Sequence, residues 1–127
     1  MGMNWNDNLS VGNDQIDRQH HRLVDMINTL EGSIAAGSDR AVLGNVLDGM
    51  VMYARKHFAD EEVILAKHIS PSAMHAHQEQ HDRFLRQAFL LQADFHSHRA
   101  NLDQAVLSFL QEWLTSHVLN SDKKAME

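Results

Sequence analysis

The sequence predicts an all-α protein, an up-down-up-down antiparallel four-helix bundle with an N-terminal arm. Three observations support this class. One proline and six glycines in 127 residues leave few helix breaks. Apolar residues recur at alternating steps of three and four along four long segments, and no segment shows the period of two that is typical of strands. The connections between the four segments are short, which favours antiparallel neighbours.

The first 15 residues are polar and aperiodic, and we expect an arm anchored through Trp5, Leu9 and Val11. A first helix is predicted over about 17–36. Its inward stripe consists of Ile16, His20, Leu23, Ile27, Leu30 and Ile34. Gly37 suits the left-handed end of that helix, and Asp39 offers an N-cap to the next one.

Three further helices follow, with Pro71 and the polar stretch 96–101 between them. The second is predicted over about 40–68, with inward Val46, Met50, Tyr53, His57, Glu61 and Ile64. The third is predicted over about 72–97, with inward Met74, His77, His81, Phe84, Ala88, Leu91 and Phe95. The fourth is predicted over about 101–120, with inward Leu102, Val106, Phe109 or Leu110, Trp113 and His117.

Composition narrows the classes of protein. The net charge of −6 argues against a nucleic-acid binder, which would present a basic face. The absence of an apolar run of 18 residues argues against a membrane segment in this chain, and no signal peptide is visible, so we expect a cytoplasmic protein. Zero cysteines exclude disulfides and thiolate clusters.

Seven metal-ligating side chains continue the inward stripes of the four helices. They are His20, His57, Glu61, His77, His81, His117 and, at or just past the end of the fourth helix, Asp122. In an up-down-up-down bundle the starts of helices one and three meet the ends of helices two and four at one pole. Unpaired ionisable groups there would each cost several kcal/mol of desolvation, which metal cations offset. The pattern predicts a two-metal site.

Ligand type alone leaves the metal open, because imidazole suits iron, copper, zinc and nickel. The inward set has neither the Glu-x-x-His pairs of ferritin-like sites nor the His-Glu-x-x-His motif of many hydrolytic zinc sites. We expect Asp60 and Glu62 in solvent or beside the ligands. Four further histidines are expected outside the site: His21, His75, His96 and His98. His75 rivals His77 by its proximity, but His77 fits the inward stripe better. His68, at the exit of the second helix near the site, is left unassigned.

Specific motifs surround these positions. They are Val11-Gly12 with Ile16-Asp17-Arg18-Gln19-His20, then His57-Phe58-Ala59-Asp60-Glu61-Glu62, then His77-Gln78-Glu79-Gln80-His81-Asp82-Arg83-Phe84, and Trp113-Leu114-Thr115-Ser116-His117 followed by Asp122. With them the chain resembles the hemerythrin family, in its bacterial branch, over nearly its whole length. The resemblance implies a single hemerythrin-like domain over 1–127, with an arm at 1–15 and the bundle at about 16–122.

The resemblance implies two iron ions. One would be held by His77, His81 and His117, and the other by His20 and His57 with one position open. Glu61 and Asp122 would bridge them together with a solvent-derived oxygen. The implied function is reversible dioxygen binding, as an oxygen carrier or an oxygen- or redox-sensing domain, and not enzymatic. Apolar residues near the ligands are expected to wall a dioxygen pocket: Leu23, Val24, Phe58, Trp113 and Leu114.

Two departures from the family pattern concern the loop and the C-terminus. The connection around Pro71 lacks the usual aromatic residue before the proline and is about one residue longer than usual. The chain stops five residues after Asp122, so we expect that it has been excised from a longer sensor with a C-terminal signalling domain. Two alternatives stay open: a di-iron enzyme acting on peroxide or nitric oxide, with His68 as its one candidate proton donor, and metal storage or zinc binding.

Overall fold

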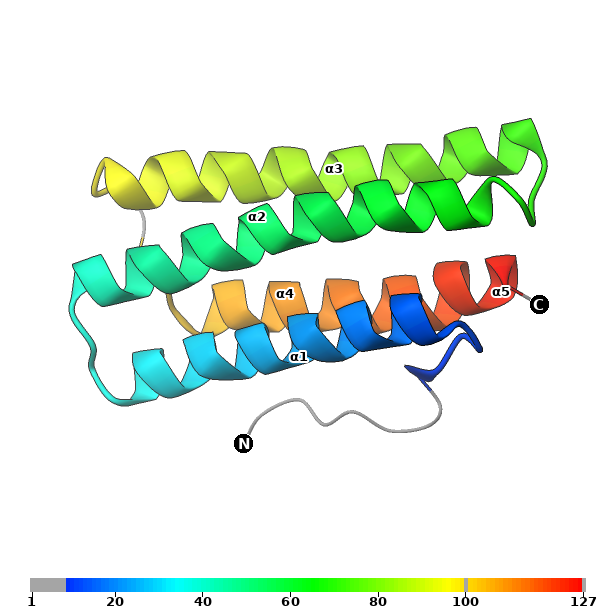
Figure 1. The fold of residues 1–127 in the computed structure, drawn as a ribbon. Helices are drawn as coiled ribbons and strands as arrows, with labels where there is room; N and C mark the ends of the chain where they lie inside the picture. Colours follow the sequence, from blue (N-terminus) through cyan, green and yellow to red (C-terminus); the bar gives the residue numbers. More distant parts are fainter. Residues whose placement is uncertain (1–8, 100, 127) are drawn as a thin grey trace.

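Four long helices form the bundle in the computed structural model, which describes residues 9–99 and 101–126 (Figure 1). They are α1 (Asp14–Ala35), α2 (Arg40–Leu65), α3 (Pro71–His96) and α4 (Gln104–His117). Helix α1 lies beside α2 and α4, and α2 lies beside α3. Successive helices run in opposite directions along the bundle. The predicted all-α, up-down-up-down architecture is confirmed.

Each long helix begins at a polar side chain that accepts a hydrogen bond from the backbone N–H three residues later. These N-cap residues are Asn13, Asp39, Ser70 and Asp103. Such a cap satisfies one of the free N–H groups at a helix start and contributes about 1 kcal/mol. Pro71 occupies the first turn of α3, where its missing N–H costs no helical hydrogen bond. Local sequence therefore fixes where the helices start.

Four helix limits lie three residues from the predicted ones, among them the end of α4 at His117 rather than 120. Helix α1 begins at Asp14 rather than 17, and α2 ends at Leu65 rather than 68. Helix α4 begins at Gln104 rather than 101, because Asp103 supplies the cap. Leu102, expected on the inward face of that helix, is buried in the connection before it.

Beyond α4 the chain stays helical but changes its winding. Residues Val118–Asp122 form a π-helix, η2, and Lys123–Ala125 form a short last turn, α5. The N–H of Lys123 bonds to the carbonyl of Val118, five residues earlier, which is the π pattern. Asp122, expected at or past the helix end, is thus held inside a continuous helical segment.

The N-terminal arm meets the bundle through two buried side chains, Leu9 and Val11. The carboxylate of Asp17 ties it down by accepting hydrogen bonds from the Val11 N–H at 2.8 Å and the Ser10 hydroxyl at 2.7 Å. The expected anchors Leu9 and Val11 are therefore buried, while Trp5 lies outside the described residues.

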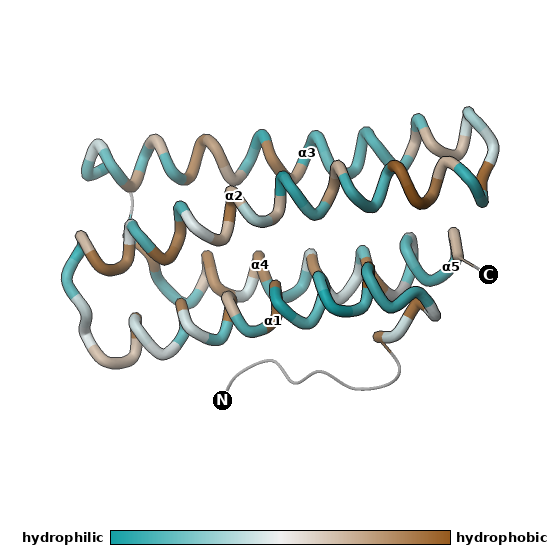
Figure 2. The backbone as a smooth tube through the Cα atoms, viewed as in Figure 1, coloured by the Kyte–Doolittle hydropathy of each residue, from teal (hydrophilic) through white to brown (hydrophobic). Residues whose placement is uncertain are grey.

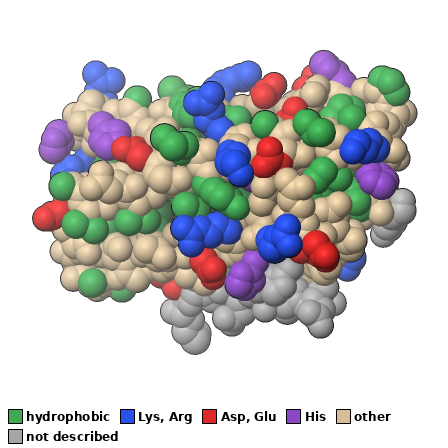
Figure 3. Space-filling view, viewed as in Figure 1, with side chains coloured by type: hydrophobic (Ala, Val, Ile, Leu, Met, Phe, Trp, Pro, Cys, Tyr) green, Lys and Arg blue, Asp and Glu red, His purple; other side chains and the backbone are tan. Residues whose placement is uncertain are grey.

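Apolar residues recur along all four helices, as the brown segments of Figure 2 show, and their side chains form one core. Phe58, Phe84 and Trp113 pack against one another near its centre, with ring centroids 4.2–5.9 Å apart. The outer surface carries scattered side chains of both charges on the face drawn in Figure 3. Among the described residues, no helix is long and apolar enough to cross a membrane.

Candidate metal centre

All seven predicted ligands lie buried at one pole of the bundle. The starts of α1 and α3 meet the ends of α2 and α4 there, with η2 beside them (Figure 1). No member of the set is more than 5% exposed. The structure brings together His20, His57, Glu61, His77, His81, His117 and Asp122.

The five imidazoles present the same atom to the centre. His20, His57 and His77 place Nε2 at 3.2, 3.1 and 2.9 Å from an oxygen of Glu61. The Nε2 atoms of His81 and His117 lie 3.0 Å apart. Asp122 has an oxygen 2.8 Å from Nε2 of both His77 and His117, and the other oxygen 3.0 Å from Nε2 of His20. Nine potential ligand atoms therefore converge, counting two oxygens per carboxylate.

The ligands divide into two overlapping sets. One set contains Glu61, His77, His81, His117 and Asp122, and the other contains His20, His57, Glu61 and Asp122. Within each set the ligand atoms lie within 4.8 Å of one another. Glu61 and Asp122 belong to both sets, so each carboxylate can bridge two cations. The first set has one imidazole more than the second.

The hydrogen bonding of this cluster is incomplete without a cation. Both carboxylate oxygens of Asp122 are buried and have no hydrogen-bond partner of suitable geometry, although imidazole nitrogens lie within 3.0 Å. Buried polar atoms are normally satisfied, and an unsatisfied one costs about 1–3 kcal/mol. A positive ion at the centre would satisfy Asp122 and the converging nitrogen lone pairs together. The donor set therefore suits metal cations with nitrogen and oxygen preference.

Protonated imidazoles and carboxylates balance one another in the metal-free protein. Burial disfavours charged His20 and His77, but their contacts with Asp122 and Glu61 outweigh it and raise both pKa values to about 9. Burial likewise opposes the charge of Asp122, yet the imidazoles around it lower its pKa to about 2. Burial dominates at His57, whose pKa is lowered. The cluster thus holds protons where metals would sit.

Three side chains outside the ligand set hold the outer nitrogens of three imidazoles. Nδ1 of His57, His81 and His117 lies 2.7, 2.9 and 3.0 Å from Gln19, Glu62 and Gln80, respectively. Such contacts fix ring orientation and leave Nε2 free for a metal. Glu62 was expected either in solvent or beside the ligands, and neither glutamine was predicted to contact a ligand. The available signal was adjacency, since Gln19 and Gln80 each precede a ligand histidine.

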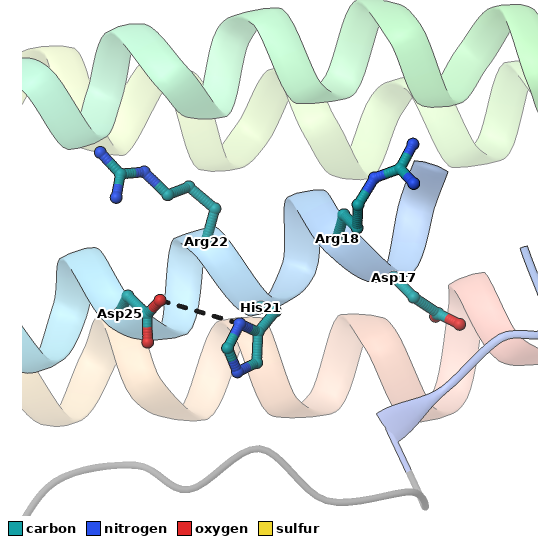
Figure 4. Close-up of a pocket in the computed structure, with 5 residues that line it drawn as sticks. All are labelled: Asp17, Arg18, His21, Arg22 and Asp25. Carbon is teal, nitrogen blue, oxygen red and sulfur yellow. Dashed lines mark ion pairs between the residues drawn. The ribbon is translucent and has the colours of Figure 1, made fainter. Parts of the chain in front are cut away.

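The five other histidines lie outside the cluster, as expected for all but His68, which the sequence left unassigned. His75 pairs with Glu79 at 3.2 Å, and His96 contacts Asp48 at 2.9 Å, both at the surface. His21 lies on the outer side of α1 in a surface depression, 3.7 Å from Asp25 (Figure 4). His68 and His98 are exposed.

A small apolar cavity of about 20 Å³ lies in the core beside the ligand layer. It is lined by Leu23, Ile27, Met50, Ala54, Phe58, Phe84, Leu110, Trp113 and Leu114. Two of these residues touch ligands directly. The Phe58 ring stacks on His81 with centroids 4.0 Å apart, and Trp113 stacks on His117 at 4.5 Å. Four of the five residues expected to wall a dioxygen pocket line this cavity, and the fifth, Val24, is buried without lining it.

Comparison with known proteins agrees with this geometry. The family model of the hemerythrin HHE cation binding domain matches residues 11–127. A hemerythrin-like protein of Naegleria gruberi is 32% identical over 121 residues, which cover 95% of this chain and 88% of the relative. A bacteriohemerythrin of Methylococcus capsulatus is 33% identical over 107 residues, covering 84% and 80%.

A solved structure shows the same architecture. The crystal structure of a wild-type hemerythrin superposes with a TM-score of 0.89 at 30% sequence identity, covering 96% of this chain and 93% of that one. The family model spans almost the entire chain, and the relatives match most of it. The chain belongs to the hemerythrin family.

Proposed function

We propose that this chain binds two iron ions and binds dioxygen reversibly at them. One observation carries the proposal: two buried ligand sets share Glu61 and Asp122, and one set has a ligand fewer than the other. Shared carboxylates suit a pair of cations held close together. The smaller set leaves room for an external ligand on one ion only.

The larger set would hold one iron through His77, His81 and His117, and the smaller set would hold the other through His20 and His57. Glu61 and Asp122 belong to both sets, so each carboxylate could serve both ions. When bound, two ferrous ions supply the two electrons that binding of dioxygen draws on. Whether dioxygen is released again or reduced further depends on the side chains around the open position of the two-histidine metal.

The protein surrounds the position with apolar side chains. Phe58, Trp113 and Leu114 line the cavity beside the ligands, and Leu23 closes it from α1. Among the described residues, the buried polar side chains are the seven ligands and Gln19. The carboxamide of Gln19 is already hydrogen-bonded to His57 and Asp60. The cavity lining therefore contains no acidic side chain, and further reduction of dioxygen needs a source of protons.

The apolar lining of the cavity also favours dioxygen binding over enzymatic turnover of peroxide or nitric oxide. His68, the residue considered as a proton donor for such an enzyme, is exposed outside the ligand cluster. We further propose that the domain acts as a carrier or as the sensing part of a longer protein. Asp122 is the last residue of η2 and is followed directly by α5, so a change at the metals would be transmitted to these C-terminal turns.

Metal analysis combined with absorption spectroscopy tests the proposal. The protein is loaded with ferrous iron, reduced anaerobically, exposed to air and then returned to vacuum. We expect two irons per chain and a visible band that appears with oxygen and disappears under vacuum. Immediate irreversible oxidation would favour redox sensing or turnover. Less than one iron per chain, or preferential tight zinc binding in a colourless protein, would contradict the di-iron proposal.

A further inference from the structure

The outer nitrogens of the histidine ligands are not held by equivalent groups. His57 and His117 meet the carboxamides of Gln19 and Gln80, whereas His81 meets the carboxylate of Glu62 at 2.9 Å. A carboxamide oxygen is a neutral acceptor. A carboxylate carries a full negative charge, so its hydrogen bond from an imidazole N–H is stronger.

Glu62 is held in a defined position. One of its oxygens contacts Nδ1 of His81, and the other accepts a hydrogen bond from the side-chain amide of Gln78 at 3.2 Å. Its side chain is 27% exposed, so it is partly shielded from water, while His81 is fully buried. Gln78 and His81 both belong to α3, whereas Glu62 follows the ligand Glu61 on α2. The contact therefore joins two helices beside the centre.

The ring of His81 is fixed on three sides. Glu62 holds Nδ1, Phe58 stacks on one face with an interplanar angle of 9°, and Nε2 points at the cluster, 3.1 Å from Glu61. With Nδ1–H committed to the carboxylate, the lone pair of Nε2 is directed at the metal position. Carboxylate-bound imidazoles are more basic ligands, and hydrogen bonding around the ligands is one of the means by which a protein tunes a metal's potential.

We propose that Glu62 is a positioning residue that makes His81 a more electron-donating imidazole than His57 and His117 and lowers the reduction potential of the three-histidine metal. The inference rests on the proposed di-iron function. According to this inference, the two metal ions differ in the charge beside their ligands as well as in the number of ligands. The larger ligand set also has the only carboxylate found among these three outer contacts, so its metal is the better stabilised in the oxidised state.

The test uses three single substitutions in the full chain. Glu62→Gln keeps the size of the side chain and an acceptor oxygen but removes the charge. Gln80→Glu places a second carboxylate opposite a ligand of the same metal, through His117. Glu79→Gln is the matched control, because it removes the same charge from the surface of α3, where Glu79 pairs with His75 and Arg83.

Two readouts besides oxygen binding are used: the reduction potential by anaerobic titration, and zinc affinity in competition with a chelator. We expect Glu62→Gln to raise the potential and weaken zinc binding roughly tenfold, within the 10–100-fold range of outer-contact changes. Gln80→Glu should lower the potential. Glu79→Gln should match the wild type in both.

The outcomes separate the two proposals. A wild-type protein that fails to bind two irons overturns the di-iron function and this inference with it. A wild type with two irons whose potential is unchanged by both Glu62→Gln and Gln80→Glu overturns the inference alone. Where Glu62→Gln does not fold or load, Gln80→Glu decides: a lowered potential supports the role of the outer charge, and an unchanged one rejects it.

Discussion

Nε2 of His117 lies 2.8 Å from a carboxylate oxygen of Asp122, although the two residues are five positions apart. A regular α-helix turns about 100° per residue, so a residue five positions on would project from a different face. The π-helix η2 widens the last turn and returns Asp122 to the inward face. A local change in winding therefore completes the ligand set.

Asp122, which the π-helix places on the inward face, should be required for binding both metal ions. We expect Asp122→Asn to lose more than about 100-fold in metal affinity, beyond the usual effect of an outer contact, since it removes a charge shared by both ligand sets. Metal analysis after dialysis should show fewer than two ions per chain. Asp82→Asn, an exposed change on α3, serves as the control and should retain both ions.

Metal affinity should rise with pH. In the metal-free protein the pKa values of His20 and His77 are about 9, so both imidazoles are protonated at neutral pH. A metal requires neutral imidazole, and binding must therefore release these protons. Zinc affinity should increase by up to about tenfold per pH unit for each released proton and level off near pH 9. Calorimetry in buffers of different ionisation enthalpy counts the protons, and pH-independent affinity between pH 7 and 9 would contradict the expectation.

The metal-free protein should lose stability in alkali. The pKa of His20 and His77 is raised above 6.5 in the folded state, so their stabilisation is complete below about pH 6.5 and disappears as the pH rises through 9. We expect the unfolding temperature of the metal-free protein to fall by at least about 10 °C between pH 6.5 and 9.5. The metal-loaded protein, whose imidazoles are already neutral, should change less. Equal shifts in both forms would count against this source of stability.

The apolar cavity should protect a bound iron pair from oxidation. Leu114→Ala and Phe58→Ala each enlarge the cavity and admit water, so we expect faster oxidation in air, followed by absorption spectroscopy. A buried Leu→Ala change also costs about 2–5 kcal/mol of stability. Leu107→Ala is the matched control because Leu107 is buried on α4 but does not line the cavity. Equal oxidation rates in Leu114→Ala and Leu107→Ala would show that the cavity does not protect the iron pair.

Local signals explain how much of the fold was predictable. Gly37 with Asp39 marks the end of the first helix and the start of the second, and Ser70 with Pro71 marks the end of the second and the start of the third. The apolar steps of three and four define the inward faces of these helices. The predicted start of α4 is three residues early because the apolar position Leu102 continues the helical stripe, whereas the capping carboxylate of Asp103 begins the helix after it. Helix ends are the least certain part of such an interpretation.

The ligand positions were predictable because each one continues an apolar stripe of known period. The hydrogen-bond partners of the ligands were not predictable. A side chain such as Gln19 contacts a residue on another helix, and the spacing of residues along one helix does not show which residue of a neighbouring helix it meets. The π-helix was missed for a related reason: inward faces were assigned with α-helical geometry throughout. The spacing of five between His117 and Asp122 was itself the signal, since both cannot face inward on a regular α-helix.

The stacking of Trp113 on His117, with rings 12° from parallel, gives the protein an internal optical probe. The chain has two tryptophans, Trp5 and Trp113, so Trp5→Phe leaves one emitter. An indole in contact with a ligand ring should lose fluorescence when a paramagnetic iron occupies the site and lose less with closed-shell zinc. Emission of that variant would follow iron loading and release in real time, without an added dye or a coloured oxygen adduct.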